Sequence, residues 1–370
     1  MRGNNMLGLI FSNIHEERLR DLTETRTMGS VPFGGRYRLI DFPLSNMVNS
    51  GINKVGVITK SKYQSLMDHL GSGKAWDLSR KREGLYILPP FGNMRMPNNR
   101  IESLASIKRF LSDSKEDLVL MTDSDVVCNV DYSELVSYHL QKGADVTMVS
   151  RFGALPQKMS KPIVLSADSE GRITDLLISP RTEGKCRFGI GMILLKRELL
   201  IRLVDDCVSR NLYGFERDLL QRNLGSLRMF SYGFSGYARI ICSPLSYFSA
   251  NMELMQPDVR AQLFNPERPI YTKVRDDMPA RYGLGAEASN SLIADGCVID
   301  GTVRNSVLFR GVRIGKGAVV ENCVILQDGR ILPGCRLKYV ITDKDVLIQN
   351  DRSLLGFESY PIFISKGSVV

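Results

Sequence analysis

A spacing of six residues near the end of the chain constrains the fold more than any other feature of the sequence. Aliphatic residues recur at this interval, each followed three residues later by a small one; the pairs are Leu308/Gly311, Ile314/Gly317, Val320/Cys323, Leu326/Gly329 and Leu332/Cys335. Neither a helix nor a simple strand repeats every six residues. A parallel β-helix does, because each hexapeptide is one short strand with an inward aliphatic side chain. We therefore predict a β-helix over residues 286–370, with a chance alternation in a β-sandwich as the alternative.

The first 250 residues show a different pattern, in which short β-branched runs alternate with helical stretches. The strand-like runs are 7–12, 54–59, 118–122, 145–150, 163–167, 190–195 and 228–232, and the helical stretches include 62–70, 101–111, 133–141 and 197–209. This alternation predicts an α/β domain with a mostly parallel sheet, whose ligands bind at the carboxyl ends of the strands. We place this domain at 1–256. Prolines at 266, 269 and 279 indicate a linker over 257–285.

Composition narrows the function classes. The chain has 370 residues, 43% of them hydrophobic and 24% charged, which is typical of a globular protein and excludes general disorder. Seven scattered cysteines without a Cys-x-x-Cys motif predict free thiols in a reducing cytoplasm, and three distant histidines argue against a zinc site. No apolar run is long enough for a membrane helix. The net charge of +9 favours anionic ligands, such as nucleic acids or phosphorylated metabolites.

Several motifs carry a family resemblance. The longest is Val31-Pro-Phe-Gly-Gly-Arg-Tyr-Arg-Leu-Ile-Asp-Phe-Pro-Leu-Ser-Asn46, and the shorter ones are Trp76-Asp-Leu-Ser-Arg-Lys81, Ile87-Leu-Pro-Pro90, Phe215-Glu-Arg-Asp218, Ala250-Asn-Met252 and Pro269-Ile-Tyr-Thr272. They resemble the corresponding segments of ADP-glucose pyrophosphorylases (glucose-1-phosphate adenylyltransferases), and the resemblance covers nearly the whole chain. It implies a Rossmann-like nucleotidyltransferase domain followed by a left-handed β-helix of hexapeptide repeats.

The resemblance also implies a chemistry, in which a sugar phosphate attacks the α-phosphorus of ATP. That reaction needs a glycine-rich loop at the phosphates, a basic side chain and two carboxylates that hold Mg²⁺. Where the family has the loop Gly-Gly-x-Gly-Thr-Arg-Leu, this chain has Asn13-Ile14-His15-Glu16-Glu17-Arg18-Leu19. The glycines are replaced at Asn13, Ile14 and Glu16, and the acidic residues place negative charge where a triphosphate is expected. His15 has no partner at a catalytic spacing, so loop filling is its simpler interpretation.

The other expected groups are missing too. The family's lysine in Arg-Ala-Lys-Pro is Met28, the lysine for the sugar phosphate is Ser179, and the second metal carboxylate is Ile240. Only Asp125, the first metal ligand, remains in place. The loss of one preorganised charged group costs about 10²–10³ in rate, so we predict a catalytically deficient site without a metal or other cofactor. Mg²⁺ is expected only in the alternative, an active enzyme that makes ADP-glucose from ATP and glucose 1-phosphate.

This combination resembles the non-catalytic, regulatory D-type subunits of the bacterial enzyme, which pair with a catalytic subunit in a heterotetramer. The resemblance implies a cytoplasmic partner of that kind in glycogen biosynthesis, and a phosphorylated metabolite or phosphate as effector. The matching effector positions are Arg26, Arg38, Arg336 and Lys338, whose alternative interpretation is ordinary solvated charge.

Two other functions are disfavoured. A hexapeptide acyltransferase needs a histidine near the repeats, but none follows His139. The basic residues Arg80-Lys-Arg82 beside Trp76 are compatible with a nucleic-acid contact. We favour the interpretation that they form a solvated loop, because the basic residues of the chain are dispersed. We therefore expect neither nucleic acid nor membrane as a partner.

Overall fold

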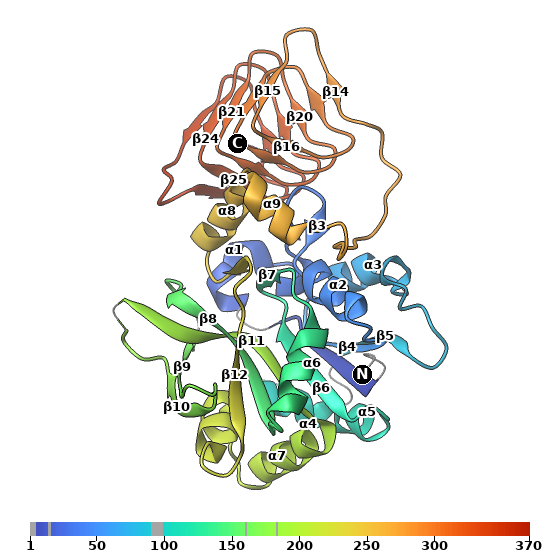
Figure 1. Cartoon of the computed structure of the whole chain (residues 1–370). Helices are drawn as coiled ribbons and strands as arrows, with labels where there is room; N and C mark the ends of the chain where they lie inside the picture. Colours follow the sequence, from blue (N-terminus) through green and yellow to red (C-terminus); the bar gives the residue numbers. More distant parts are fainter. Residues whose placement is uncertain (1–4, 14–15, 90–98, 160, 183) are drawn as a thin grey trace.

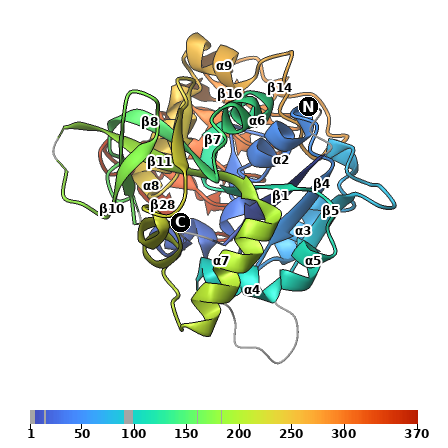
Figure 2. The ribbon, with the colours of Figure 1, turned by 60° about the horizontal axis from the view of Figure 1, so that its bottom comes forward.

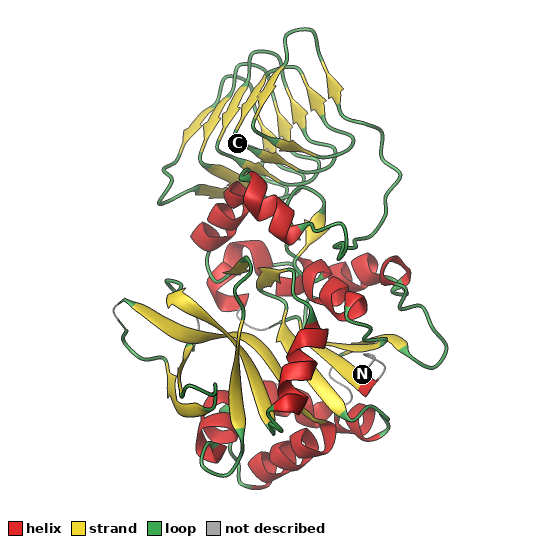
Figure 3. Cartoon of the chain, in the orientation of Figure 1, coloured by secondary structure: helices red, strands yellow, loops and turns green. Residues whose placement is uncertain are grey.

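The N-terminal domain is built on a mixed sheet. The structure, a computed structural model, describes residues 5–13, 16–89, 99–159, 161–182 and 184–370, and in this part of the chain the sheet has nine strands (Figures 1 and 3). Parallel strands form its centre, in the order β6 (Leu118–Asp123), β1 (Met6–Phe11), β4 (Lys54–Ile58) and β5 (Gly84–Leu88). Beyond β6 the sheet continues antiparallel with β11 (Lys185–Lys196). The remaining strands are β8 (Val146–Ala154), β9 (Ile163–Ala167), β10 (Ile173–Ile178) and β12 (Met229–Gly233).

Helices cover both faces of this sheet, because its central strands are apolar on both faces. In β1, Met6 and Ile10 join the core on one face, while Leu7, Leu9 and Phe11 join the core on the other. The first core includes residues of α2 (Asp41–Asn49), α3 (Gln64–Leu70) and α6 (Tyr132–Gln141). The second includes residues of α4 (Arg100–Ser106), α5 (Lys108–Ser112) and α7 (Arg197–Ser209), which Figure 2 brings to the front.

The C-terminal domain is a left-handed parallel β-helix with three sheets of five strands, as predicted. The first sheet is β14 (Arg281–Tyr282), β17 (Val298–Ile299), β20 (Arg313–Ile314), β23 (Arg330–Ile331) and β26 (Leu347–Ile348). The second is β15 (Glu287–Ser289), β18 (Thr302–Arg304), β21 (Val319–Glu321), β24 (Arg336–Lys338) and β27 (Ser353–Leu355). The third is β16 (Leu292–Ile293), β19 (Val307–Leu308), β22 (Val324–Ile325), β25 (Val340–Thr342) and β28 (Ile362–Ile364).

The hexapeptide pattern slips by one residue at the third sheet. From Arg313 to Arg330 and from Val319 to Arg336, each coil advances 17 residues, one fewer than three hexapeptides. As a result, Ile325 and Ile331 point into the β-helix core, whereas Leu326 packs in the cluster between the two domains. Leu332 is only half-buried. The six-residue rule therefore predicts the correct fold but misplaces two of its five aliphatic positions.

A third apolar cluster joins the two domains. Phe33, Phe42 and Tyr247 of the N-terminal domain pack there with Val324 and Ile341 of the third β-helix sheet. The helices α8 (Pro244–Glu253) and α9 (Pro257–Leu263) lie between the sheet domain and the β-helix (Figure 1). Both α9 and β14 fall inside the segment predicted as a linker. Pro257 at its start is in the first turn of α9, where proline is tolerated.

Short elements complete the chain: α1 (Arg20–Thr23), β2 (Pro32–Phe33), β3 (Tyr37–Arg38), β7 (Val126–Cys128), β13 (Ala238–Ile240), and several short turns of 3-10 or π helix. Within the described residues, no helix is both long and apolar enough to span a bilayer.

Candidate functional site

An alkyl side chain, that of Ile240, lies on the strand paired with the residue after Asp125. Asp125 follows β6 and is buried, and β7 begins directly after it. β13 pairs antiparallel with β7, so Ile240 lies opposite Val126, and the Ile241 N–H donates to the Asp125 carbonyl at 2.8 Å. Ile240 is buried in the apolar core of the domain. The position beside Asp125 that the resemblance assigns to a second metal carboxylate therefore carries no oxygen.

The neighbouring carboxylate, Asp123, is paired with an arginine. Nη2 of Arg100 lies 2.6 Å from Oδ1 and 2.8 Å from Oδ2 of Asp123, and both side chains are almost fully buried. Among the residues that the structure describes, no three His, Cys, Asp or Glu side chains are grouped as a metal site. A site with two carboxylate ligands for Mg²⁺ thus does not fit the residues present, and we derive no reaction step through a metal.

Side-chain hydrogen bonds tie down the loop after β1. Asn13 donates to Glu16 Oε1 (2.5 Å) and to the carbonyl of Ser61 (3.2 Å), and its Oδ1 accepts from the Lys60 N–H (2.8 Å). The backbone N–H of Met28 also donates to Glu16. Burial raises the pKa of Glu16 to about 7, against an ordinary 4.5, although these hydrogen bonds and two lysines favour its charged form. The side-chain amide of Asn13 is therefore engaged within the protein, where the family pattern has a glycine that faces phosphate. Ile14 and His15 lie outside the described residues.

The two positions of expected lysines carry no cation. Met28 is fully buried and packs in the cluster between the domains, next to Leu22 and Val31. Ser179 is exposed after β10, has a positive φ of 53° and donates its N–H to the carbonyl of Pro162. Neither residue is able to offset charge on a phosphate.

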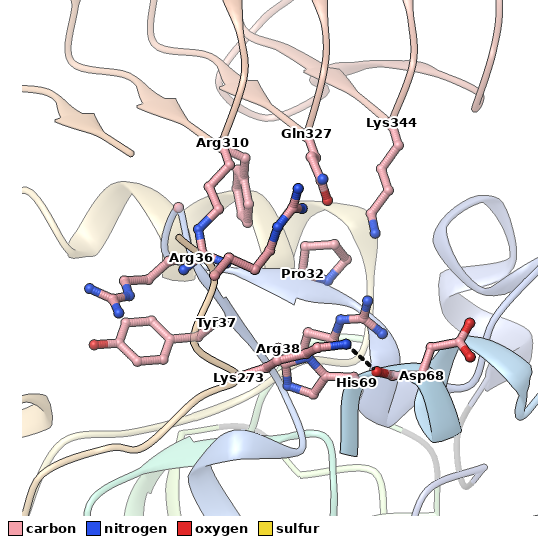
Figure 4. A pocket seen from close by; sticks show the side chains of 13 residues that line it. Pro32, Arg36, Tyr37, Arg38, Asp68, His69, Lys273, Arg310, Gln327 and Lys344 are labelled. Atoms are coloured by element: carbon pink, nitrogen blue, oxygen red, sulfur yellow. Dashed lines mark hydrogen bonds between the residues drawn. The ribbon is translucent and has the colours of Figure 1, made fainter. Parts of the chain in front are cut away.

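A cationic cleft lies between the two domains (Figure 4). It has a volume of about 240 Å³. Six arginine and lysine residues of the described lining surround it: Arg36, Arg38, Lys273, Arg275, Arg310 and Lys344. Asp68 is the one acidic residue of its described lining, and the Lys273 ammonium donates to the backbone carbonyl of Asp68 at 2.6 Å (dashed in Figure 4). So much charge of one sign around a small volume makes this cleft suitable for an anion.

The β-helix supplies one wall of this cleft through its 17-residue coil. Arg310, Gln327 and Lys344 occupy equivalent corners of three successive coils, so their side chains project side by side (Figure 4). The opposite wall comes from the β2–β3 hairpin, which holds Arg38. Nη1 of Arg38 donates to both the carbonyl (2.5 Å) and the hydroxyl (2.9 Å) of Ser65.

The cations of the cleft repel one another. Burial, together with the nearby Arg38 and Arg26, lowers the pKa of Lys344 to about 8, while Asp343 opposes the shift. Burial also lowers the pKa of Arg38 to about 10. The pKa of Arg310 is lowered by burial and then by Arg36. A bound anion would relieve this repulsion, so the cleft has a physical reason to bind one.

Comparison with known proteins identifies the family. The family described as "Nucleotidyl transferase" matches residues 9–232, and the one described as "GlmU-like, C-terminal hexapeptide" matches residues 277–359. The glycogen biosynthesis protein GlgD of Bacillus subtilis (strain 168) is 35% identical over 378 residues, covering 100% of this chain and 98% of the relative. This chain belongs to the family of GlgD proteins and glucose-1-phosphate adenylyltransferases.

Both branches of this family are similar to the chain. GlgD of Geobacillus stearothermophilus is 39% identical over 320 residues, covering 86% of this chain and 83% of the relative. The glucose-1-phosphate adenylyltransferase of Thermotoga neapolitana is 36% identical over 326 residues, covering 86% of this chain and 76% of the relative. The family expected from the sequence motifs is confirmed.

The structure separates the four effector positions carried over from the GlgD and adenylyltransferase family. Arg38 lines the cleft. Arg26 is buried and forms two hydrogen bonds with Asp343, so its guanidinium holds the domains together. Arg336 and Lys338 are exposed on β24 and are not part of the cleft. Five other residues of the cleft lining were not predicted from the sequence: Arg36, Lys273, Arg275, Arg310 and Lys344. The sequence holds one signal for two of them, because Arg310 and Lys344 each lie 17 residues from Gln327, which is the length of one coil.

Proposed function

We propose that this protein is a regulatory, catalytically deficient subunit that modulates ADP-glucose synthesis for glycogen by associating with a catalytic glucose-1-phosphate adenylyltransferase subunit. The pairing of Ile240 with Val126, directly after Asp125, carries the proposal. A single carboxylate with an alkyl neighbour is a poor Mg²⁺ ligand set, since Mg²⁺ requires oxygen ligands in near-octahedral geometry. The similarity to proteins named GlgD, beside similarity to the adenylyltransferases, supports the same assignment.

The missing groups act at different steps of the reaction. A metal carboxylate orients the triphosphate, the lysine position at Met28 would offset charge on the leaving pyrophosphate, and the position at Ser179 would hold the sugar phosphate. Each loss alone costs about 10²–10³ in rate, and such losses in one site are not made good by the single remaining Asp125. Such a protein would regulate ADP-glucose synthesis by binding an effector and a catalytic subunit, and the catalytic subunit would carry out the reaction.

The cleft between the domains is our candidate for the effector site. We assign it to phosphate or a phosphorylated metabolite, bound by Arg38 together with Arg310 and Lys344. An anion there would contact both domains at once, so it would favour one relative arrangement of the domains over others. In a heterotetramer with a catalytic subunit, that preference is passed on as linkage between effector binding and the activity of the partner. We expect this assembly to be cytoplasmic.

The decisive experiment is reconstitution. The chain alone is incubated with ATP, glucose 1-phosphate and Mg²⁺, and then with a catalytic homologue, and ADP-glucose formation is measured with and without phosphorylated effectors. We expect no turnover by the chain alone and a changed maximal rate or effector response in the mixture. Turnover by the isolated chain at the rate of an ordinary enzyme would instead establish the alternative function, an active nucleotidyltransferase.

The effector assignment has its own test. The double variant Arg310→Ala/Lys344→Ala removes two cations from one wall of the cleft, and Arg313→Ala removes an exposed cation from β20 as the matched control. In the reconstituted complex, we expect the double variant to lose the response to effector and the control to keep it. An unchanged response in the double variant would exclude the cleft as the effector site.

A further inference from the structure

The segment that joins the two domains passes beside the cationic cleft. Residues 271–280 form neither helix nor strand. The start of the segment is attached to the N-terminal domain, where the Tyr271 N–H donates to Ser45 Oγ at 2.8 Å. Its end is attached to the β-helix, where the Met278 carbonyl accepts from the Gly296 N–H at 2.5 Å. The residues between these two contacts therefore cross from one domain to the other.

One carboxylate of this segment, that of Asp277, faces two cations of the cleft. Its Oδ2 lies 3.4 Å from Nε of Arg275 and 3.7 Å from Nε of Arg310. Arg275 belongs to the joining segment and Arg310 to the β-helix, and both line the cleft. A second carboxylate, that of Asp295, lies 3.9 Å from Nε of Arg310 but is half exposed. Asp277 therefore pairs with one cation from each side of the domain boundary.

The contact between Asp277 and Arg310 is an ion pair without a hydrogen bond. Nε of Arg310 and Oδ2 of Asp277 are both buried, and neither atom has a hydrogen-bond partner among the described residues. A separation of 3.7 Å keeps the Coulomb attraction but exceeds the length of a hydrogen bond. Hydrogen bonds from arginine to a phosphate oxygen are among the strongest in proteins. An oxyanion that reaches this guanidinium is therefore a stronger partner for it than Asp277 is.

The charges around Arg310 have two opposing effects. Burial and then Arg36 lower the pKa of its guanidinium, whereas Asp277 and Asp295 raise it. The two carboxylates thus offset part of the repulsion among the cations. They also repel an anion that enters the cleft, and a negative charge that shares its cations with a ligand lowers the affinity for that ligand. The position of Asp277 therefore weakens anion binding while it steadies the cations.

We propose that Asp277 is an internal competitor for the cations of the cleft and sets how tightly the cleft binds an oxyanion. Its carboxylate pairs with Arg275 and Arg310, and a phosphate or sulfate group exchanges with it for both guanidinium groups. A ligand with more than one negative charge, such as a phosphate ester, gains most from this exchange, because its attraction to the cations grows with its charge. The inference rests on the assignment of the cleft to an anionic effector in the proposed function, and it adds the residue that regulates the affinity.

The test is a calorimetric titration with sulfate at pH 7 and constant ionic strength. At this pH the ammonium of Lys344 is mostly charged, because its pKa is about 8. We expect Asp277→Asn to bind sulfate about tenfold more tightly than the unchanged chain, because the side chain keeps its size but no longer competes for the cations. Asp276→Asn removes the same charge from the exposed neighbouring residue and is the matched control. Its affinity should stay within about twofold of the unchanged chain, because solvent screens an exposed charge.

Thermal unfolding gives a second readout. Without sulfate, Asp277→Asn leaves Arg275 and Arg310 without this carboxylate, so we expect its midpoint to lie below that of Asp276→Asn. Saturating sulfate should reduce the difference, because the coupling between the carboxylate and the anion acts equally on stability and on affinity.

Three results would overturn the proposal. They are unchanged or weaker sulfate binding by Asp277→Asn, an equal gain in Asp276→Asn, and a stability difference that sulfate does not reduce. If Asp277→Asn does not fold, Asp277→Ala removes the carboxylate without adding an amide, and we expect the same gain in affinity. If neither variant folds, Asp277 is a residue required for folding and the proposal is wrong.

The double variant Arg310→Ala/Lys344→Ala separates this inference from the function on which it rests. Loss of sulfate binding in the double variant, together with equal affinities of Asp277→Asn and Asp276→Asn, rejects the inference and keeps the cleft as the anion site. Sulfate binding that persists in the double variant rejects the cleft and the inference with it. None of these readouts involves the catalytic partner, so none of them tests the association with that subunit.

Discussion

Arg26 and Asp343 join the two domains through a pair of hydrogen bonds, from Nη1 to Oδ1 at 2.9 Å and from Nη2 to Oδ2 at 3.0 Å. The residues are 317 positions apart in sequence, and each is only about 3% exposed as a side chain. Arg26 lies two residues before Met28, whose N–H bonds Glu16, and Asp343 precedes Lys344 of the cleft. The ion pair therefore lies between the loop after β1 and the candidate effector site.

The first prediction concerns this ion pair. Arg26→Ala leaves the Asp343 carboxylate buried without its guanidinium, and we expect a loss of about 3–5 kcal/mol in the free energy of unfolding. Denaturant titration measures the loss. Arg109→Ala breaks an exposed ion pair and should leave the midpoint unchanged. An Arg26→Ala chain as stable as the unchanged one would show that the apolar cluster alone holds the domains together.

The second prediction concerns Glu16 and pH. Because burial raises its pKa to about 7, the folded chain binds more protons than the unfolded chain between about 4.5 and 7, and this group's contribution to stability decreases as the pH rises through that window. We expect Glu16→Gln to stabilise the chain by about 1–2 kcal/mol at pH 8 and much less at pH 5, a value reduced because Glu16 is only partly buried. Denaturant titration at both pH values measures the two differences.

Glu24, which is exposed in the same segment, provides the control for this experiment. The difference between Glu24→Gln and the unchanged chain should not depend on pH. If the Glu16→Gln difference is also the same at pH 5 and pH 8, the loop after β1 does not hold Glu16 in a protonated state.

The third prediction concerns Lys344. Its pKa of about 8 means that the ammonium loses its proton as the pH rises through 8, whereas a bound anion favours the charged form. We expect the affinity for sulfate, whose charge is constant in this range, to fall up to about tenfold between pH 7 and pH 9. Calorimetry in buffers of different ionisation enthalpy should detect proton uptake on binding at pH 8.

Lys344→Met should abolish this proton uptake, and Lys316→Met, at an exposed corner of the β-helix, should preserve it. Sulfate binding that releases no buffer heat and does not depend on pH would place the anion away from Lys344.

The fourth prediction concerns Met28. Restoring a lysine at this position buries an ammonium group in the apolar cluster between the domains, so Met28→Lys should cost about 3 kcal/mol or more and should not produce enzymatic activity. Met67→Lys, at an exposed methionine, is the matched control and should be tolerated. Thermal unfolding and an ADP-glucose assay give the two readouts. A stable and active Met28→Lys chain would contradict our proposal that the protein is catalytically deficient.

The two-domain fold is legible in the sequence because each domain repeats a pattern that local geometry enforces. Alternating strands and helices predict the sheet domain. The six-residue interval predicts the β-helix, because every repeat must place an aliphatic side chain in the narrow interior of the coil. The pattern fails at Leu326, because the coil there advances 17 residues instead of 18 and Leu326 packs in the cluster between the domains. The six-residue period describes spacing within the β-helix, so it does not predict a contact with the other domain.

For the candidate site, the sequence predicted only which residue types of the family pattern are missing. The absence of glycines, lysines and the second carboxylate is legible at Asn13, Met28 and Ile240 against the family pattern. Arg100 belongs to no motif, and its pairing with Asp123 depends on how α4 packs against the ends of β1 and β6. The same holds for Arg26, whose partner Asp343 lies in the other domain.

The order of residues alone predicts the fold class, the family and the absence of the residue types that the family pattern places at the site, because these depend on residue type and on spacing along the chain. The tertiary structure alone decides which charged side chains are paired, buried or gathered in the cleft. Docking of the β-helix buried Arg26 against Asp343 and placed Arg310 and Lys344 opposite Arg38. Charge interactions depend on distance and burial in space, and neither quantity is contained in a linear spacing.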